Sequence, residues 1–240
     1  MKIAGIQKLT LLDFPGRCAA TIFTPGCNLR CPFCHNASLV DPSYVQQTIE
    51  HNELIEPEEV LEFLKERFGR LTGLAVTGGE PLMQPGIMEF LQKVKELGYA
   101  VKLDTNGTNP ERLRALLSAG IVDYVAMDFK NCREKYALTT GISESSAAIL
   151  YESTLLSADF IKKSGVEYEF RTTVVKQFHT VDDIRAIARA LAGVPKYFLQ
   201  CFEDSGDILG GEYAACSKET MHEMLAAARE FVPNAQLRGM

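Results

Sequence analysis

Residues 24–36 read TPGCNLRCPFCHN and place three thiols within eight residues, in the spacing Cys27-x3-Cys31-x2-Cys34. Thiolates are soft ligands that favour zinc, copper(I) and iron–sulfur clusters. A structural zinc site normally closes with four ligands, and His35 is a poor fourth because it adjoins Cys34 and would have to turn back onto the same ion. A four-iron cluster held by three cysteines keeps one iron free of protein ligands. This spacing therefore predicts a [4Fe–4S] cluster with one open coordination site.

Three other interpretations of this stretch stay open at this point. CPFCH matches the attachment pattern of c-type haem, which normally matures after export. CPFC matches a thioredoxin-type redox pair, although that interpretation leaves Cys27 without a role. A structural zinc site is the third. The remaining cysteines are scattered, and we interpret them as small buried hydrophobic residues: Cys18, Cys132, Cys201 and Cys216.

The composition is that of a globular protein, with 46% hydrophobic and 23% charged residues among 240. This length suits a single domain over residues 1–240 with a substantial core. The 25 basic and 31 acidic residues give a net charge of −6, which does not favour binding to nucleic acid. The longest stretch free of charged side chains, residues 18–29, is too short to span a membrane, and the N-terminal residues lack the pattern of a secretion signal. We therefore expect no membrane partner and a cytoplasmic location, where thiols stay reduced.

Strand-like and helix-like patterns alternate along the chain. Runs rich in β-branched and aromatic residues predict six strands, at 19–24, 73–77, 99–104, 121–127, 167–175 and 196–202. Apolar residues at helical spacing predict six helices, at 57–68, 86–97, 110–119, 148–164, 181–192 and 217–230. The alternation indicates an α/β fold with a parallel sheet, which either curls into a barrel or stays doubly wound. Three long segments without a clear period are candidates for functional loops: 36–56, 129–147 and 203–216.

Polar residues follow the predicted strands at the same end. In barrels of parallel strands the chemistry gathers at the carboxyl ends of the strands, so a site is expected at these positions. The residues concerned are Gly78, Gly79 and Glu80 after the second strand, Asp104, Thr105 and Asn106 at the end of the third, Asp128 and Lys130 at the end of the fourth, Arg171 within the fifth and Gln200 near the end of the sixth. Each has an ordinary structural explanation by itself. Their coincidence predicts one site beside the cysteines.

The motifs resemble those of the radical S-adenosylmethionine (SAM) enzymes. The hallmark Cys-x3-Cys-x-aromatic-Cys of that family is matched by Cys27, Cys31, Phe33 and Cys34, and GGEP follows one strand later. FTPGCNLRCPFCHN, LDTNG and MDFK are similar to the activating enzymes of glycyl-radical enzymes. LLDFPGRCAATIF is most similar to the single-domain activating proteins of anaerobic ribonucleoside-triphosphate reductases. The resemblance covers nearly the whole chain.

The resemblance implies a partial (β/α)6 TIM-type barrel, the radical SAM core, with a [4Fe–4S] cluster held by Cys27, Cys31 and Cys34 at its mouth. It also implies that SAM chelates the open iron. The residues implied at SAM are Gly78, Gly79 and Glu80 at the amino group, Lys130 and Arg171 at the carboxylate, Phe33 near the adenine, and Asp104 and Asn106 in the same site. A monovalent cation is further implied near Asp104, Thr105 and Asp128.

The implied reaction is the reductive cleavage of SAM to methionine and a 5′-deoxyadenosyl radical, which takes a hydrogen from the Cα of a glycine in a partner enzyme. The resemblance implies an anaerobic ribonucleotide reductase as the partner and a flavodoxin or ferredoxin-type electron donor. Activation of another glycyl-radical enzyme, of the pyruvate formate-lyase type, and radical chemistry on a small molecule stay open as alternatives. The pyruvate formate-lyase activases usually carry a histidine at the end of the sixth strand, whereas this chain has Phe202 at the nearest position. His179 is expected in a loop or at a helix start rather than at the cluster.

Overall fold

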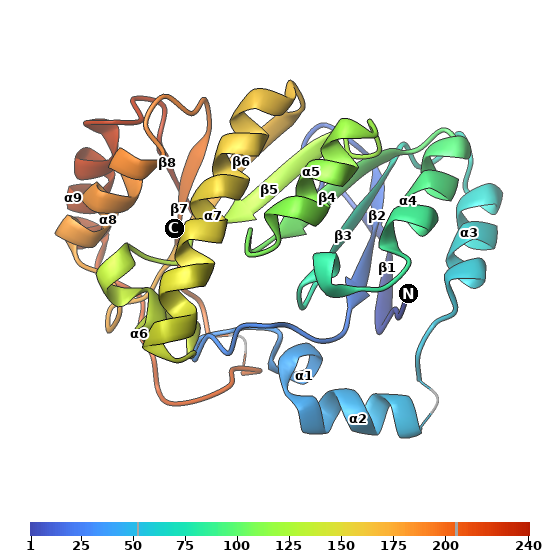
Figure 1. The fold of residues 1–240 in the computed structure, drawn as a ribbon, viewed down its shortest axis with the longest axis horizontal. Coiled ribbons are helices and arrows are strands. Elements are labelled where there is room, and N and C mark those ends of the chain that lie inside the picture. Colours follow the sequence, from blue (N-terminus) through green and yellow to red (C-terminus); the bar gives the residue numbers. More distant parts are fainter. Residues whose placement is uncertain (52, 205) are drawn as a thin grey trace.

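A computed structural model describes residues 1–51, 53–204 and 206–240, and eight strands within these ranges form one sheet. The strands follow each other in the sheet in the order in which they occur in the chain, from β1 to β8. β1 is antiparallel to β2, and every later pair of neighbours is parallel. The parallel arrangement requires a crossover between successive strands, and helices supply it (Figure 1).

The elements have the following bounds. The strands are β1 (Gly5–Thr10), β2 (Ala19–Thr24), β3 (Gly73–Gly78), β4 (Ala100–Thr105), β5 (Tyr124–Asp128), β6 (Glu167–Val174), β7 (Tyr197–Cys201) and β8 (Gln236–Arg238). The α-helices are α1 (Ala37–Val40), α2 (Pro42–Glu50), α3 (Pro57–Glu66), α4 (Ile87–Glu96), α5 (Pro110–Ser118), α6 (Tyr136–Thr140), α7 (Glu144–Ser164), α8 (Val181–Ala190) and α9 (Lys218–Arg229). Two short 3₁₀ helices are η1 (Pro81–Met83) and η2 (Arg133–Lys135).

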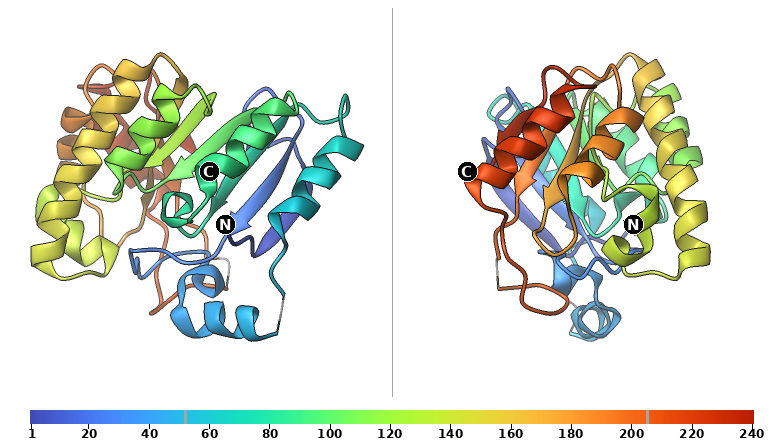
Figure 2. Two further views of the ribbon diagram at one scale, coloured as in Figure 1. Left: turned by 45° about the vertical axis from the view of Figure 1, so that its right-hand side comes forward. Right: turned by 90° about the vertical axis from the view of Figure 1, so that its left-hand side faces the viewer.

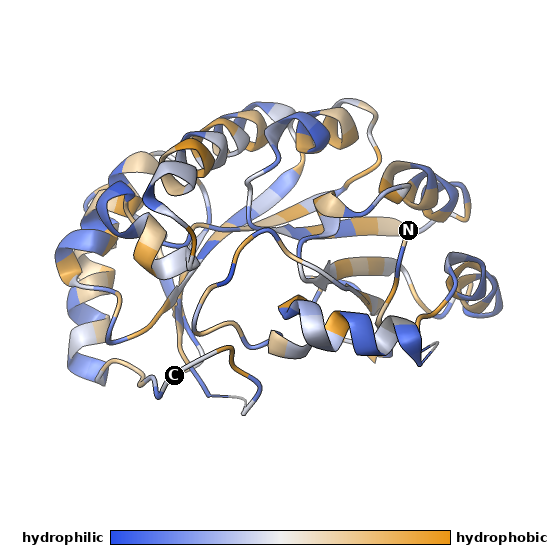
Figure 3. Ribbon diagram, turned by 60° about the horizontal axis from the view of Figure 1, so that its bottom comes forward, coloured by the Kyte–Doolittle hydropathy of each residue, from blue (hydrophilic) through white to orange (hydrophobic). Residues whose placement is uncertain are grey.

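The sheet is curled, and α3, α4, α5, α7, α8 and α9 form an arc around its outer face, while α1 and α2 lie apart from this arc, at the bottom of the view (Figures 1 and 2). Figure 3, which turns the lower end of Figure 1 toward the viewer, shows the strands inside this arc. Because β1 and β8 are at opposite ends of the strand order, the barrel is not closed. The predicted partial (β/α)6 TIM-type barrel is confirmed, and the doubly wound alternative is not adopted.

All six predicted strands are present, as β2 to β7. The main difference is at 121–127, where the strand begins only at Tyr124, although Ile121 and Val122 before it are buried. β1 and β8 were not predicted. β1 reads GIQKLT and has three exposed residues in a row, so it lacks the apolar run that marks a strand buried on both faces.

All six predicted helices are present, and their ends follow from local capping. Thr180 accepts a hydrogen bond from the backbone N–H of Asp183 and forms a capping box at the start of α8, while the Ser217 side chain accepts a hydrogen bond from the Thr220 N–H at the start of α9. Gly98 follows α4 with φ of 87°, in the left-handed region that glycine occupies without strain. α7 begins at Glu144, four residues before the predicted start.

Two of the three predicted loops are wrong in part. Segment 36–56 contains α1 and α2, and segment 129–147 contains η2, α6 and the first turn of α7. Within the described residues of 203–216 there is no helix or strand. The missed helices are short or polar, with α6 only five residues long, so their sequences carry little periodic signal.

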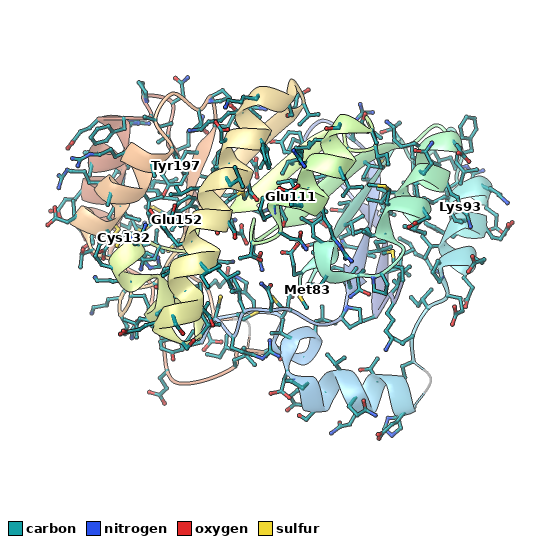
Figure 4. The ribbon with its side chains drawn as sticks, viewed as in Figure 1. Met83, Lys93, Glu111, Cys132, Glu152 and Tyr197 are labelled. Carbon is teal, nitrogen blue, oxygen red and sulfur yellow. The ribbon has the colours of Figure 1, made fainter. Side chains whose placement is uncertain are left out.

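The two faces of the curled sheet carry different side chains. On β4, Val101 and Leu103 belong to the main core beneath the helices, whereas Ala100, Lys102 and Asp104 alternate with them and face the barrel interior. Figure 4 shows Tyr197 of β7 beneath the helices, while Lys93 and Glu111 lie on the exposed sides of α4 and α5. The amino end of the barrel interior is filled by Phe14, Ala19, Ala100, Tyr124 and Ala126. The polar side chains are therefore gathered toward the carboxyl end.

In the ranges that the structure describes, no helix is both long enough and apolar enough to cross a membrane.

Candidate active site

A cavity of about 260 Å³ lies at the carboxyl ends of the parallel strands. Every predicted site residue except Glu80 lines it. The predicted residues in its wall are Cys27, Cys31, Phe33, Cys34, Gly78, Gly79, Asp104, Asn106, Lys130 and Arg171. Thr105, Asp128 and Gln200 line it as well. The fold thus brings together residues that are up to 173 positions apart, because parallel strands all end at the same edge of the sheet.

The cysteine loop between β2 and α1 is tied to other parts of the chain. The Gly26 N–H donates to the carbonyl of Leu39 at 2.6 Å, and the Arg30 N–H donates to the carbonyl of Thr140 at 2.8 Å. An added Cβ on Gly141 would lie 2.0 Å from the carbonyl oxygen of Arg30, so the loop is in close contact with the end of α6. These contacts fix the path of the loop before any cofactor binds.

Of the three thiol-bearing residues, Cys31 is buried, and Cys27 and Cys34 are half-buried. Burial raises the pKa of Cys27 to about 11, with a further contribution from the negative charge of Glu80, and burial raises the pKa of Cys31 to about 12. The pKa of Cys34 is also raised by burial. Without a metal, these thiols hold their protons at neutral pH. A cationic metal centre would stabilise the thiolates, so its binding would release protons.

The arrangement of the thiols fits a cluster. Among the described residues, no three Cys, His, Asp or Glu side chains stand in a group that could share one metal ion. In a four-iron cluster each thiolate binds a different iron, so three thiols spaced around one cavity are what such a cluster needs. Cys27, Cys31 and Cys34 satisfy this condition.

Aromatic rings close one side of the cavity. The Phe33 ring, 3% exposed, lies 5.4 Å from the ring of Phe178 and 6.4 Å from that of Phe202, measured between centroids. Phe202 also stacks on the ring of His35, at 6.2 Å and an interplanar angle of 19°. His179 lies just before α8, as predicted, and its Nε2 is 2.9 Å from the carbonyl oxygen of Lys130. Burial lowers the pKa of His179, so its ring is neutral and packs behind Phe33.

Gly78 and Gly79 are required by the close approach of two chain segments. A Cβ on Gly78 would lie 2.5 Å from the backbone nitrogen of Thr24, and a Cβ on Gly79 would lie 2.0 Å from the carbonyl oxygen of Gly26. The Gly79 N–H donates to the Thr24 carbonyl at 2.7 Å. The Gly78 carbonyl accepts a hydrogen bond of 3.1 Å from the side chain of Asn36. The GGE turn and the cysteine loop are therefore packed backbone against backbone.

Glu80 does not line the cavity. It is 1% exposed, and its carboxylate points inward. One oxygen accepts hydrogen bonds from the Thr105 hydroxyl at 2.8 Å and the Leu82 N–H at 3.0 Å, and the other accepts from the Asn106 N–H at 2.8 Å. Glu80 thus joins the end of β3 to the end of β4 and holds Asn106 in place. Burial raises the pKa of Glu80 to about 7, although these hydrogen bonds oppose the shift.

This pKa predicts a measurable pH dependence of stability. Because the folded protein raises the pKa of Glu80 from 4.5 to about 7, the stability that this group contributes is present below pH 4.5 and is lost as the pH rises through 7. Between pH 5 and pH 8, urea unfolding of the cluster-free protein should show a loss of up to about 3 kcal/mol that Glu80→Gln does not share. The exposed Glu66 provides the control, and Glu66→Gln should follow the wild type. Equal slopes for the wild type and Glu80→Gln would contradict the prediction.

Asn106 connects the end of β4 to the cysteine loop. Its side-chain nitrogen is 3.7 Å from the Cys27 sulfur and donates to the Asn28 side chain at 3.1 Å. Asn28 donates to the Thr108 hydroxyl at 2.8 Å, and Thr108 donates back to the side-chain oxygen of Asn106 at 2.6 Å. This ring of hydrogen bonds fixes the Asn106 amide with its N–H groups toward Cys27. Donors of this kind influence the reduction potential of an iron–sulfur cluster.

Charged side chains form a paired group at the floor of the cavity. Asp128 accepts from Lys130 at 2.9 Å and from the Arg171 Nε at 2.8 Å. Asp104 accepts from the Arg171 Nη1 at 3.2 Å and from the Lys102 ammonium. Burial opposes the charge on Asp128, but the positive charges of Arg171 and Lys130 hold the pKa of its carboxyl below the usual range. In turn, Asp128 raises the pKa of both basic groups against the effect of their burial. All three are therefore ionised.

Sequence reasoning did not identify Lys102, Asn36 or the Asn28–Thr108 pair as parts of this region. Lys102 had a detectable signal, because it lies two residues before Asp104 in a strand and so shares its face. Asn36 and Asn28 flank the cysteine motif, but their partners are known only once the fold is known.

Fold and cavity together define an α/β barrel with a three-cysteine loop at its mouth. The chain belongs to the radical SAM superfamily, whose family model matches residues 21–191. Members of this family use a [4Fe–4S] cluster and SAM, and the thiols described above fit such a cluster.

Similar proteins extend this comparison. A candidate glycyl-radical enzyme activating enzyme of Methanocaldococcus jannaschii is 31% identical over 98% of this chain and 95% of its own length. The pyruvate formate-lyase-activating enzyme of Clostridium pasteurianum is 28% identical over 81% of this chain and 76% of its own length.

Solved structures agree on the fold. SuiB of Streptococcus suis, in a structure with its precursor peptide SuiA, matches this chain with a TM-score of 0.65 at 12% sequence identity. The match covers 91% of this chain and 48% of SuiB. The structure of anSMEcpe with bound SAM has a TM-score of 0.56 at 20% identity and covers 87% of this chain and 58% of its own length. At these identities the likeness concerns the fold alone.

Proposed function

We propose that this protein is a radical SAM activase that installs a glycyl radical on an anaerobic ribonucleoside-triphosphate reductase. The observation that carries the proposal is that three thiols and the polar strand-end residues line one cavity. The similarity to the Methanocaldococcus jannaschii protein, which extends over nearly both chains, supports the activase class. The stretch LLDFPGRCAATIF supports the choice of partner.

Cys27, Cys31 and Cys34 would hold the cluster through their sulfur atoms. The backbone of Gly78 and Gly79, which lines the cavity, would receive the amino group of SAM. Its carboxylate would be received by Lys130 and Arg171, and its adenine by Phe33. Glu80 has a different part in this proposal from the one that the resemblance implies, because it does not line the cavity. It positions Asn106 rather than touching SAM.

When bound, the cluster and SAM together supply a one-electron reduction that generates an organic radical. The protein contributes the surroundings of that event. The buried aromatic wall around Phe33 excludes water, and the backbone contacts between the GGE turn and the cysteine loop hold both binding groups at a fixed separation. Together with Lys102, the basic groups on the cavity floor outnumber the carboxylates by one, which favours an anionic group above them.

The partners of this reaction are part of the same proposal. A backbone Cα can reach the cavity only if the partner enzyme offers its glycine on an extended loop. The cluster needs a flavodoxin or ferredoxin-type protein as electron donor. Neither nucleic acid nor a membrane is required.

Electron paramagnetic resonance tests the proposal. The anaerobically reconstituted and reduced protein is mixed with SAM and an anaerobic ribonucleotide reductase. A glycyl radical doublet that depends on all three components is the expected result. Formation of 5′-deoxyadenosine without that doublet would reject the proposed partner, and one bound zinc without iron or sulfide would reject the radical chemistry altogether.

The second candidate is the activation of a different glycyl-radical enzyme. It is favoured by the similarity to the pyruvate formate-lyase-activating enzyme of Clostridium pasteurianum. Against it stands Phe202, which is buried against Phe33 where those activases usually carry a histidine. The same experiment with pyruvate formate-lyase in place of the reductase separates the two candidates.

A further inference from the structure

Lys102 is a buried charged residue in the barrel interior, 2% exposed, directly below the cavity. We propose that its ammonium group is a built-in counter-ion of Asp104 and takes the place of a free monovalent cation, so that this site binds neither Na⁺ nor K⁺. The family resemblance implies such a cation near Asp104, Thr105 and Asp128. In this chain those three residues already have other partners.

The position of Lys102 follows from the strand. Val101 and Leu103 on either side of it are in the core beneath the helices, so Lys102 points the other way, into the barrel. On the neighbouring strand β3 its register partner is Ala75, whose small side chain leaves room for a long one. Asp104 is two residues further along β4 and therefore lies on the same side. The ammonium group reaches up the barrel to this carboxylate.

Every carboxylate oxygen at the implied cation site accepts from a cationic nitrogen. Asp104 receives Lys102 on one oxygen and Arg171, at 3.2 Å, on the other. Asp128 receives Arg171 at 2.8 Å on one oxygen and Lys130 at 2.9 Å on the other. A monovalent metal ion would have to displace or crowd these donors, because it needs the same oxygen atoms.

The third implied ligand is turned away from this place. The Thr105 hydroxyl donates to Glu80 at 2.8 Å and accepts from the Gly107 N–H at 3.1 Å. Glu80 belongs to the connection after β3 and Gly107 to the connection after β4, so neither partner is part of the charged group on the floor. The hydroxyl is therefore committed elsewhere.

The balance of charge points in the same direction. Lys102, Lys130 and Arg171 are three cationic groups around the two carboxylates Asp104 and Asp128, which leaves one excess positive charge. The buried carboxylate of Glu169, whose charge also acts on Arg171, is balanced by its ion pair with Arg238 and does not change this sum. Adding a metal ion would double that excess in a buried place where repulsion is weakly screened. Without Lys102 the remaining four groups would be neutral in sum. Lys102 is thus the group that makes a free cation unnecessary.

Thermal unfolding in different salts tests the proposal without relying on the activase function. The full chain, both as purified and after anaerobic cluster reconstitution, is melted in sodium, potassium and tetramethylammonium chloride at equal ionic strength. Tetramethylammonium is too large and too weakly coordinating to replace a bound metal ion. The wild type should have the same melting temperature in all three salts. A wild type that is selectively stabilised by Na⁺ or K⁺ would overturn the proposal, and this comparison needs no variant.

Removing the charge of Lys102 should make the melting temperature depend on Na⁺ or K⁺, unlike that of the wild type. Lys102→Met keeps the length of the side chain and removes its charge. In tetramethylammonium chloride its melting temperature should be about 6 °C or more below that of the wild type, because a buried pair loses one partner. Sodium or potassium should restore part of this loss, and line broadening of the ²³Na resonance should appear for this variant only. A variant that melts like the wild type, or that is equally unstable in all three salts, would overturn the assignment.

Two further variants serve as controls. Lys102→Arg keeps the charge and should remain insensitive to the identity of the salt. Lys95 makes a partly exposed ion pair with Asp123 at 2.8 Å, on α4 and away from the cavity. Lys95→Met should therefore lose stability without gaining a response to Na⁺ or K⁺. If it gained the same response, the effect would not be specific to the cavity floor and the proposal would fail.

Discussion

Replacing any one of Cys27, Cys31 and Cys34 by alanine is expected to abolish binding of the iron–sulfur cluster. The three thiols are the only cysteines among the described residues that line the cavity. With only two thiolate ligands, a four-iron cluster would be lost to solvent. Iron and sulfide analysis after anaerobic reconstitution should fall from about four of each per chain to near zero. The absorption of the cluster in the visible region should disappear with them.

Cys18 provides the matched control for this loss. It is partly buried next to the main core, before β2, and does not line the cavity. Cys18→Ala should keep the iron and sulfide content of the wild type. Equal iron loss in all four variants would mean that the metal does not bind at the barrel mouth.

Gly79→Ala is expected to have the second largest effect. The new methyl group would lie 2.0 Å from the carbonyl oxygen of Gly26, and the backbone on both sides of this contact is held by hydrogen bonds, from the Glu80 N–H to the Gly26 carbonyl and from the Gly79 N–H to the Thr24 carbonyl. The GGE turn and the cysteine loop would have to move apart. Urea unfolding should show a loss of about 3 kcal/mol. Equilibrium dialysis should show that SAM no longer binds, because the loop and the turn carry different parts of its proposed site.

Gly5→Ala separates this effect from the general cost of replacing glycine. An added Cβ at Gly5 would meet nothing closer than the Phe23 side chain at 3.8 Å, which is an ordinary contact. Like Gly79, Gly5 does not have a positive φ. Gly5→Ala should therefore change the free energy of unfolding by less than about 0.5 kcal/mol and leave SAM binding intact. Similar losses in both variants would argue against the contact at Gly26 as the cause.

The positions of the parallel strands could be predicted because most of these strands are buried on both faces. Such strands appear as continuous apolar runs, and β2 to β5 are buried at nearly every position. β8 escaped prediction because three residues carry no period. α2 escaped because PSYVQQTIE has few apolar residues and no acidic residue in its first turn.

The location of the site could be predicted, but the direction of individual side chains could not. Topology alone places the strand ends together, which explains why Asp104, Asp128 and Arg171 meet. Whether Glu80 faces the cavity depends on competition between water and three donors, one in η1 and two at the end of β4. Likewise, the pairing of Asp104 with Lys102 depends on the space that Ala75 leaves across the sheet. Such details arise from tertiary packing and have no local pattern.

The contact between the cysteine loop and the corner that joins α6 to α7 has a consequence for dynamics. Arg30 is hydrogen-bonded to Thr140, and its carbonyl rests against the bare Cα of Gly141. The loop cannot swing outward unless this corner, more than a hundred residues later, opens with it. The two segments therefore form one cooperative unit of local unfolding, and amide hydrogen exchange in both should respond together to cofactor loading.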